Sequence, residues 1–378
     1  MANDNYGSVA TPRIFVDYIQ YAKAQGMIRD FSYNTTRVSS NNSEALWDMN
    51  PTNVAEFTII DAGDGSFSAG NFMANFKYAG DDAAGLQFRN LISTANYGAL
   101  LGHNIGLFDP NRYVESRVRD GAASHTSIVG HNTCKNNIGY NIWKINHFVS
   151  GGNPIEDLTF FDRLGFKINK GTGGVEWSVG DVIRMGAFST GRYFDLPHSA
   201  NLSLNQTISY DGVQTKRTIG GSDLTQINYK RPKWGDFSPW THIDLGSYTD
   251  QGINPQQAME DQDYSTAGFQ GRRSWDLSFS YISKDDMFPR IFSNNTGGYY
   301  DNNTSSFDDG DTDGGMYKDN VVNNWLNVTM GGQISHILQP DNDKPNDFAI
   351  VKMAKNSLQI TQQAPSLYEF KVKLIEQF

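Results

Sequence analysis

The sequence pattern that most constrains the fold is the strict alternation of apolar and polar side chains in short segments. The clearest example covers residues 272–281 (RRSWDLSFSY), where Trp275, Leu277, Phe279 and Tyr281 alternate with serine and aspartate. Successive side chains of a β-strand point to opposite faces of a sheet, so this alternation is typical of a half-buried strand.

Similar segments recur along the chain, whereas helical periodicity is scarce. One short helix is predicted after Asp17, which serves as its amino-terminal cap, and Gly26 ends it. Many short strands separated by Gly- and Asn-rich turns favour a β-sandwich or jelly roll. The predicted strands are residues 12–16, 55–60, 72–78, 97–101, 140–148, 164–168, 182–188, 202–210, 213–219, 348–353, 357–362 and 368–376.

One hairpin is predicted in the second half of the chain. Residues 202–210 (LSLNQTISY) alternate strictly and are followed by Asp211-Gly212, a favoured two-residue hairpin turn. We therefore expect residues 213–219 to form the returning strand.

These patterns predict a mainly β chain in three parts. Residues 1–54 form an N-terminal strand, a helix and an arm, and residues 55–190 form a jelly-roll-like β-sandwich domain. Residues 191–378 form a second, antiparallel β domain with long polar loops at 246–271 and 294–320. Loops of this length are uncommon in a compact monomer. We therefore expect neighbouring chains to order them.

The composition narrows the function classes. Charged residues make up 19% of the chain, below the typical level of about 25%, and aromatic residues make up 13%. The 31 Lys and Arg against 41 Asp and Glu give a net charge of −10, with no basic face for direct nucleic-acid binding. Cys134 is the single cysteine, so no internal disulfide forms.

Membrane and secretion signals are absent from the sequence. Apolar runs stay far below the ~18 residues that span a bilayer. The first ten residues have neither the basic region nor the apolar region of a secretory signal. We therefore expect no membrane partner, and assembly in the cytoplasm of the cell that makes the chain.

A repeated Gly-His-Asn tripeptide, at residues 102–104 and 130–132, raises the possibility of a metal site. Its two histidines are common metal ligands, but a third ligand at a recognisable spacing is missing. We expect two strand ends instead, where Gly permits a tight turn and Asn or His satisfies backbone groups.

A second metal candidate lies in the Asn/Asp-rich loop. Asp309, Asp311 and Asp313, followed by Gly314, match the first half of a calcium-binding EF-hand loop. The twelfth position is Asn320 rather than glutamate, and flanking helices are not predicted. A solvated acidic loop is the expectation and a Ca²⁺ site the alternative, and no cofactor is predicted.

Signatures of enzymes are missing. The sequence contains neither G-x-S-x-G nor a Walker A or dinucleotide-binding motif, and Cys134 is expected to be a small buried filler. Glycosidase chemistry needs two close carboxylates, and spacing selects none of the available ones. Those considered are Asp195, Asp236, Glu260 and Asp276. We predict that the chain is not an enzyme.

Short basic clusters and nearby aromatic residues are the candidates for an interface. Residues 230–234 (KRPKW) and the pair Arg272-Arg273 interrupt an acidic chain next to predicted strands, a placement more typical of protein interfaces than of nucleic-acid sites. Aromatic side chains anchor such contacts. The predicted interface residues are Trp234, Arg272, Arg273, Tyr299 and Tyr300.

Three segments resemble virion structural proteins of tailed bacteriophages, especially marine phages. Residues 99–106 (ALLGHNIG) are similar to a strand end of their jelly-roll domains. Residues 183–199 (IRMGAFSTGRYFDLPHS) together with 272–279 resemble a second pattern, and residues 336–378 resemble their carboxy-terminal pattern.

This resemblance implies a virion structural protein whose sandwich domain is followed by a tail-associated β domain. The implied role is a tail or baseplate/adaptor ring component, located in the virion tail. The implied partners are copies of itself in a threefold or sixfold ring and other virion tail proteins.

The alternative is a carbohydrate-binding, host-recognition module that binds a host surface glycan. Trp143, Trp177, Tyr299 and Tyr300 are its candidate sugar-stacking rings. The competing expectation for Trp143 and Trp177 is that both belong to the core.

Overall fold

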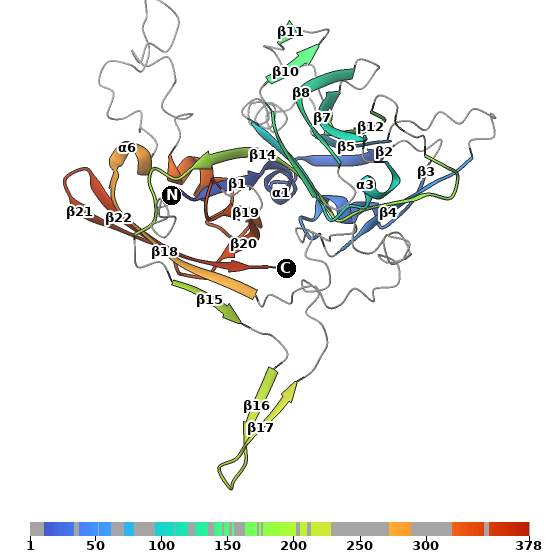
Figure 1. Cartoon of the computed structure of the whole chain (residues 1–378). Helices are drawn as coiled ribbons and strands as arrows, with labels where there is room; N and C mark the ends of the chain where they lie inside the picture. The colour runs from blue at the N-terminus through green and yellow to red at the C-terminus, as the bar shows by residue number, and fades with distance from the viewer. Residues whose placement is uncertain are drawn as a thin grey trace, which may run out of the picture. The chain divides into compact units, whose positions relative to one another are not determined.

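The structure, a computed structural model, consists mainly of short strands with few helices (Figure 1). The mainly β prediction is confirmed, and the several antiparallel sheets are consistent with a protein of β-sandwich type. Within the described ranges no helix exceeds seven residues. Those ranges are residues 11–33, 38–51, 53–61, 72–78, 95–109, 111–119, 125–134, 140–145, 147–150, 153–154, 163–171, 174, 177–201, 205–209, 213–227, 272–288, 320–343 and 348–377.

The chain folds into two compact units, each assembled from separated stretches of sequence. Unit 1 contains Met1–Asp17, Arg192–Thr207 and Arg273–Gln377, and unit 2 contains Tyr18–Gly191 and Ile208–Arg272. The sequence-based division keeps residues 1–54 together. In the structure residues 13–15 pair with a strand near the carboxyl end, and residues 13–17 belong to unit 1.

Unit 1 is built on one twisted sheet. Its strands are β1 (Arg13–Asp17), β15 (Asn205–Ser209), β18 (Arg272–Ser283), β19 (His336–Gln339), β20 (Ala349–Met353), β21 (Gln359–Ala364) and β22 (Leu367–Glu376). The strand order is β15-β18-β22-β20-β19-β1, and β21 lies beside β22. From β18 to β1 every neighbouring pair is antiparallel. Two short helices, α6 (Lys284–Met287) and the π-helix η3 (Val322–Asn327), accompany the sheet.

The alternation that predicts strand β18 also predicts most of its buried face. Trp275, Leu277 and Phe279 are almost completely buried. Tyr281, predicted on the same face, is 75% exposed and has a φ of 65°. The pairing with β22 shifts register between Phe279 and Ile282. Because such an irregularity inserts an extra residue, it turns Tyr281 outward and Ile282 inward.

Unit 2 contains several smaller antiparallel sheets. The largest has the order β11-β10-β8-β7-β12-β5-β2, and a second has the order β13-β4-β3. β14 pairs through its first five residues, the part that belongs to unit 2, with β6, and β6 pairs in turn with β9. β16 pairs with β17. The strands are β2 (Ile28–Tyr33), β3 (Val38–Asn41), β4 (Ala55–Ile59), β5 (Phe72–Tyr78), β6 (Tyr97–Leu101), β7 (Tyr113–Arg119), β8 (His125–Thr133), β9 (Tyr140–Lys144), β10 (His147–Ser150), β11 (Asn153–Pro154), β12 (Arg163–Asn169), β13 (Val182–Met185), β14 (Ala187–Asp195), β16 (Val213–Arg217) and β17 (Asp223–Ile227).

Three short helices belong to unit 2: α1 (Tyr18–Ala24), the 3₁₀-helix η1 (Ser43–Trp47) and α3 (Ile105–Phe108). The first confirms the helix predicted after Asp17. Gly26 follows it with a φ of 68°, the left-handed conformation that glycine adopts most readily at a helix end.

The core of unit 2 is a continuous layer of aromatic rings contributed by separate sheets. Phe57 of β4 lies 4.8 Å from Phe72 of β5, measured between ring centroids. Phe72 lies 6.1 Å from Phe166 of β12, which lies 4.7 Å from Phe188 of β14. All four rings are buried. The inner faces of the sheets therefore pack on one another, as in a β-sandwich.

Two predicted strands are each divided in the structure. Residues 140–148 form β9 and β10, which belong to different sheets. Residues 182–188 form β13 and the start of β14, separated at Gly186. A side chain at Gly186 would run into the backbone of Pro51, so only glycine permits this approach.

The prediction of a hairpin between residues 202–210 and 213–219 is wrong. Residues 213–219 do not return along residues 202–210: β16 pairs with β17, and β15 lies beside β18. A tight turn explains the difference, because the Thr218 hydroxyl donates to the carbonyl of Ser222 and accepts from its N–H, both at 3.0 Å. Gly221 adopts the left-handed conformation that this turn requires, with a φ of 84°.

Candidate functional site

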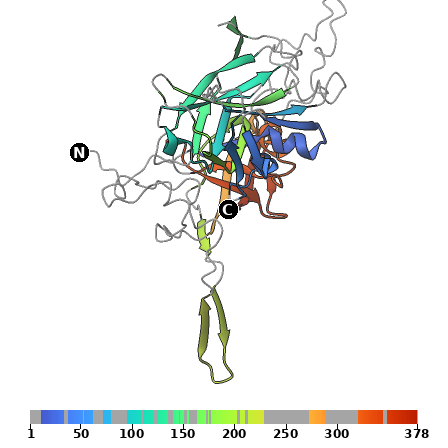
Figure 2. The same ribbon diagram turned by 90° about the vertical axis from the view of Figure 1, so that its right-hand side faces the viewer.

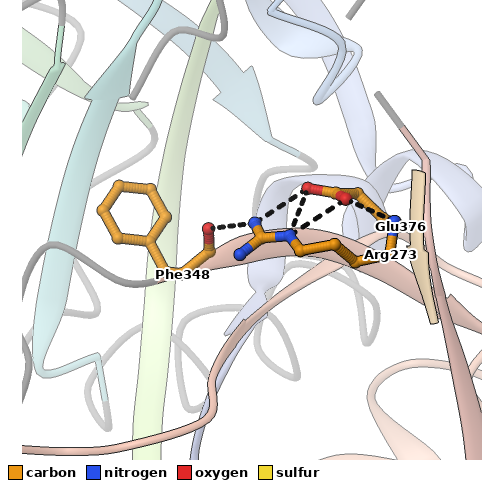
Figure 3. Close-up of polar contacts among 3 residues, drawn as sticks. All are labelled: Arg273, Phe348 and Glu376. Atoms are coloured by element: carbon orange, nitrogen blue, oxygen red, sulfur yellow. Dashed lines mark hydrogen bonds and ion pairs between the residues drawn. The ribbon is translucent and has the colours of Figure 1, made fainter. Parts of the chain in front are cut away.

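The predicted interface residue Arg273 is engaged inside unit 1 (Figure 3). Its guanidinium contacts both carboxylate oxygens of Glu376, with Nη2 donating to Oε1 at 2.9 Å and Nε to Oε2 at 3.1 Å. The Arg273 backbone N–H donates to the same carboxylate at 2.8 Å, and Nη2 also donates to the Phe348 carbonyl at 3.1 Å. Only 14% of the Arg273 side chain and 7% of the Glu376 side chain are exposed. This buried pair joins β18 to the end of β22.

The other predicted site residues are only partly covered by the structure. Arg272 is half-buried at the start of β18. Among the residues that the structure describes, no group of three or more His, Cys, Asp or Glu side chains could hold a metal ion. The remaining predicted residues lie outside the described ranges: Trp234, Tyr299, Tyr300, Asp309, Asp311 and Asp313, as do Asp236, Glu260 and the loops 246–271 and 294–319.

The first Gly-His-Asn tripeptide is a strand end, as predicted. Gly102 follows β6 with a φ of 67°. The Asn104 amide donates to the Val182 carbonyl at 3.0 Å, and its oxygen accepts from the Arg184 N–H at 2.9 Å. The second tripeptide, residues 130–132, lies within the last four residues of β8 rather than after the strand. Its Asn132 amide donates to the Ile142 carbonyl at 2.8 Å, so it satisfies a backbone group as predicted.

His103 belongs to a buried hydrogen-bond network rather than to a metal site. Its Nε2 lies 2.7 Å from Oδ1 of Asn141, whose amide donates to Asn132 Oδ1 and to the Thr133 carbonyl, each at 3.0 Å. Asn141 Oδ1 is therefore an acceptor, and His103 Nε2 carries the proton. Nδ1 accepts from the Ile105 N–H at 3.4 Å. Burial lowers the pKa of His103 to about 4, so the ring is neutral.

Unit 1 holds a second buried, neutral histidine. Trp325 Nε1 donates to His336 Nε2 at 3.1 Å, and His336 Nδ1 donates to the Ile334 carbonyl at 2.9 Å. Burial is the main cause that lowers the pKa of His336 to about 4, and the Lys352 cation contributes. Both ring nitrogens are satisfied in one tautomer, which identifies His336 as a structural residue.

Cys134, Trp143 and Trp177 are core residues, as predicted. Burial raises the pKa of the Cys134 thiol to about 12, so the thiolate needed for nucleophilic chemistry is not formed near neutral pH. Trp143 is 4% exposed and donates to Ser116 Oγ at 3.0 Å. Trp177 is 1% exposed, with the Arg112 guanidinium 3.5 Å from its ring centroid.

The two candidate catalytic carboxylates in the described ranges each pair with a cation on a neighbouring strand. Asp195 accepts from Arg13 Nε at 2.6 Å and from Nη2 at 3.0 Å. Asp276 lies 3.7 Å from Lys373 Nζ. All four side chains are partly exposed. Their arrangement is that of surface ion pairs.

Two strand elements present open edges and exposed side chains. β21 pairs with β22 alone among the described strands, its side chains from Gln359 to Gln363 are exposed, and it contains no charged residue. We call this the β21 edge.

The β16–β17 hairpin, residues 213–227, is a separate two-stranded ribbon closed by a turn (Figures 1 and 2). Ile219 in its turn is fully exposed, and Leu224 is 63% exposed.

No protein-family model matches the chain, and no curated protein has a matching sequence. Within the described ranges no helix is both long enough and apolar enough to cross a membrane.

Proposed function

We propose that the chain is a structural subunit of a bacteriophage virion. In this proposal it is a tail or baseplate/adaptor ring component that acts by associating with copies of itself and with other tail proteins. The observation that carries the self-association is the β21 edge. A strand whose second edge is open offers a row of backbone N–H and C=O groups to another chain.

The residue types of β21 support pairing with another chain. Natural proteins protect exposed edges with lysine, with proline or with inward-pointing charges. β21 (QITQQA) has none of these between Gln359 and Ala364. The nearest charges, Glu369 and Lys371 on β22, pair with each other at 3.1 Å, so the edge is electrically neutral. A neutral polar strand can lose its water at lower cost than a charged one.

The glycan-binding alternative has less support. Two of its four candidate stacking rings, Trp143 and Trp177, are buried in unit 2, and a sugar ring needs an exposed aromatic face. No observation on the described residues favours it over self-association.

The test is the mass of the full chain in solution. Light scattering after gel filtration and negative-stain electron microscopy should show a ring-sized oligomer at micromolar concentration. Thr361→Lys should raise the dissociation constant at least tenfold, because it places a charge on the β21 edge. The Thr361 side chain is exposed, so the lysine can extend into solvent and β21 should still fold.

A matched control separates the edge effect from added charge. Gln25→Lys introduces the same charge at an exposed residue just after α1, and the oligomer should keep its mass. A chain that stays monomeric at every concentration tested would overturn the proposed assembly function.

A further inference from the structure

The β16–β17 hairpin is an element whose stability its own contacts do not explain. It forms a two-stranded sheet of its own, and every side chain from Thr215 to Thr225 is exposed except Thr218, which is half-exposed. An isolated two-stranded hairpin is marginally stable at best in water. Ile219 and Leu224 also place apolar side chains in solvent where neither contributes to a core of its own chain.

The hairpin carries a small positive charge in an otherwise acidic chain. Residues 213–227 contain Lys216, Arg217 and Asp223, which gives 2 − 1 = +1. The rest of the chain therefore carries −10 − 1 = −11. The β21 edge of a second copy is neutral, so charge does not oppose its pairing with this hairpin.

The same chain also offers a surface of the right kind to receive the hairpin. The β21 edge is uncharged and has one open side, and β16 begins with three uncharged residues, Val213, Gln214 and Thr215. Addition of β16 or β17 along this edge would satisfy open backbone groups on both elements. Pairing between two different surfaces of identical subunits is heterologous, and it closes into a ring when the rotation permits.

We propose that the β16–β17 hairpin of one copy docks on the β21 edge of the next copy, adding strands to its unit 1 sheet. This assignment rests on the proposed self-assembly function and names the two surfaces that carry it. Backbone pairing along β21 supplies the register, and Ile219 and Leu224 lose their exposure in the contact.

Cross-linking between variants that each carry one introduced cysteine tests the proposal directly. Cys134 is buried and its thiol pKa is raised to about 12, so it does not interfere. Thr215→Cys places a thiol on the hairpin, and Thr361→Cys places one on the β21 edge. When the two proteins are mixed and treated with a short bis-maleimide, we expect a linked dimer between them. Because each chain carries one new thiol, the link can form only between copies.

The pattern of links distinguishes the possible contacts. Little dimer should form with either variant alone, or when Thr215→Cys is mixed with Gln25→Cys. The heterologous arrangement predicts a link between a Thr215→Cys chain and a Thr361→Cys chain, which we call the mixed link. It would be overturned if links formed instead between two Thr215→Cys chains or between two Thr361→Cys chains.

A second measurement uses the apolar residues of the hairpin. The double variant Ile219→Ser, Leu224→Thr should raise the dissociation constant of the oligomer at least tenfold. Its circular dichroism spectrum should remain unchanged. Val179→Ser removes an apolar side chain that is 46% exposed elsewhere in unit 2, and it should leave the oligomer intact.

The outcomes separate this inference from the proposed function. An oligomer that shows no mixed cross-link and is insensitive to the double hairpin variant overturns the role of the hairpin but leaves self-assembly standing. A wild-type chain that is monomeric at all concentrations overturns both.

Discussion

Acid should destabilise unit 1 through a single buried histidine. His336 is completely buried, and its neutral ring accepts a hydrogen bond from Trp325 Nε1. Protonation of Nε2 would place two donors face to face and leave a charge without solvent. The unfolded chain carries no such constraint, so it binds the proton more readily than the folded chain does.

The magnitude follows from the difference between the two pKa values. In the unfolded chain the His336 pKa is near its ordinary 6.5, and in the folded chain burial lowers it to about 4. Each pKa unit corresponds to about 1.4 kcal/mol. Between pH 6.5 and pH 4 the unfolded state binds more protons, so stability falls as the pH falls. The loss from His336 should approach roughly 3 kcal/mol at pH 4, and above pH 7 it should be absent.

Urea unfolding of the wild type and of His336→Gln at pH 7, 6, 5 and 4 measures this loss. Glutamine does not titrate, and its amide can reproduce one of the two ring hydrogen bonds. At pH 7 the variant should be less stable by about 1–3 kcal/mol, the cost of the bond that it loses. As the pH falls the two stabilities should converge, because only the wild type loses the histidine contribution. Carboxylates titrate in both proteins, so the difference isolates His336.

A constant difference between wild type and variant from pH 7 to pH 4 would refute this reasoning. It would mean that His336 is charged in the folded state, or that water reaches the ring. Amide hydrogen exchange of residues 320–343 then locates the change, since acid opening at His336 must expose the backbone of η3 first.

Three further outcomes follow from the described contacts. Arg273→Met should cost roughly 3–5 kcal/mol in urea unfolding, because the Glu376 carboxylate stays buried without its cation. Combining it with Glu376→Leu should recover most of the loss, and a double variant as unstable as the single one would contradict a buried pair. Gly98→Ala should lower the free energy of unfolding by about 1–3 kcal/mol, since the added carbon would lie 2.6 Å from the buried indole ring of Trp143. Gly220→Ala is the control: its added carbon would meet nothing nearer than 3.9 Å, and it should change stability by less than about 0.5 kcal/mol. Cys134 should react with iodoacetamide at pH 8 only after unfolding in urea, and rapid labelling of the folded protein would contradict its burial and raised pKa.

The strands with a clear alternation of apolar and polar residues were predictable because their signal is local. In residues 272–279 the alternation of side chains follows directly from backbone geometry, and it predicts both the strand and the burial of Trp275, Leu277 and Phe279. The exposure of Tyr281 was not predictable in this way. A register shift depends on the partner strand as well as on the strand itself.

Strand pairing was not predictable because its partners are distant. β1 pairs with β19, so Arg13 lies opposite Gln339 across more than three hundred residues of chain. The Asp211-Gly212 turn signal favours a hairpin that the structure does not form, because the turn at Thr218 closes a competing one. Turn propensity is local, whereas the choice between two turns depends on which strands find partners.

The candidate site residues show the same contrast between local signals, which the sequence carries, and distant partners, which it does not. A basic doublet at Arg272-Arg273 in an acidic chain favours an interface, but the sequence does not reveal that Glu376 lies 103 residues further on and occupies Arg273. His103 was correctly placed at a strand end, yet its partner Asn141 was not identifiable, since a lone Asn carries no spacing signal.

The chain has few charged residues, and its ion pairs show where several of them are used. Several of its charged side chains are used in ion pairs inside a unit, where they join neighbouring strands or stabilise one strand. Charges used in this way cannot also protect strand edges, and β21 is left without any. In a monomer such an edge is an aggregation hazard, whereas in an assembly it is the surface that the next subunit covers. In the proposed assembly, the scarcity of charge and the open edge would both favour contact between subunits. The pairs are Arg13–Asp195 and Arg273–Glu376 in unit 1, and Arg117–Glu115 and Arg184–Glu56 in unit 2.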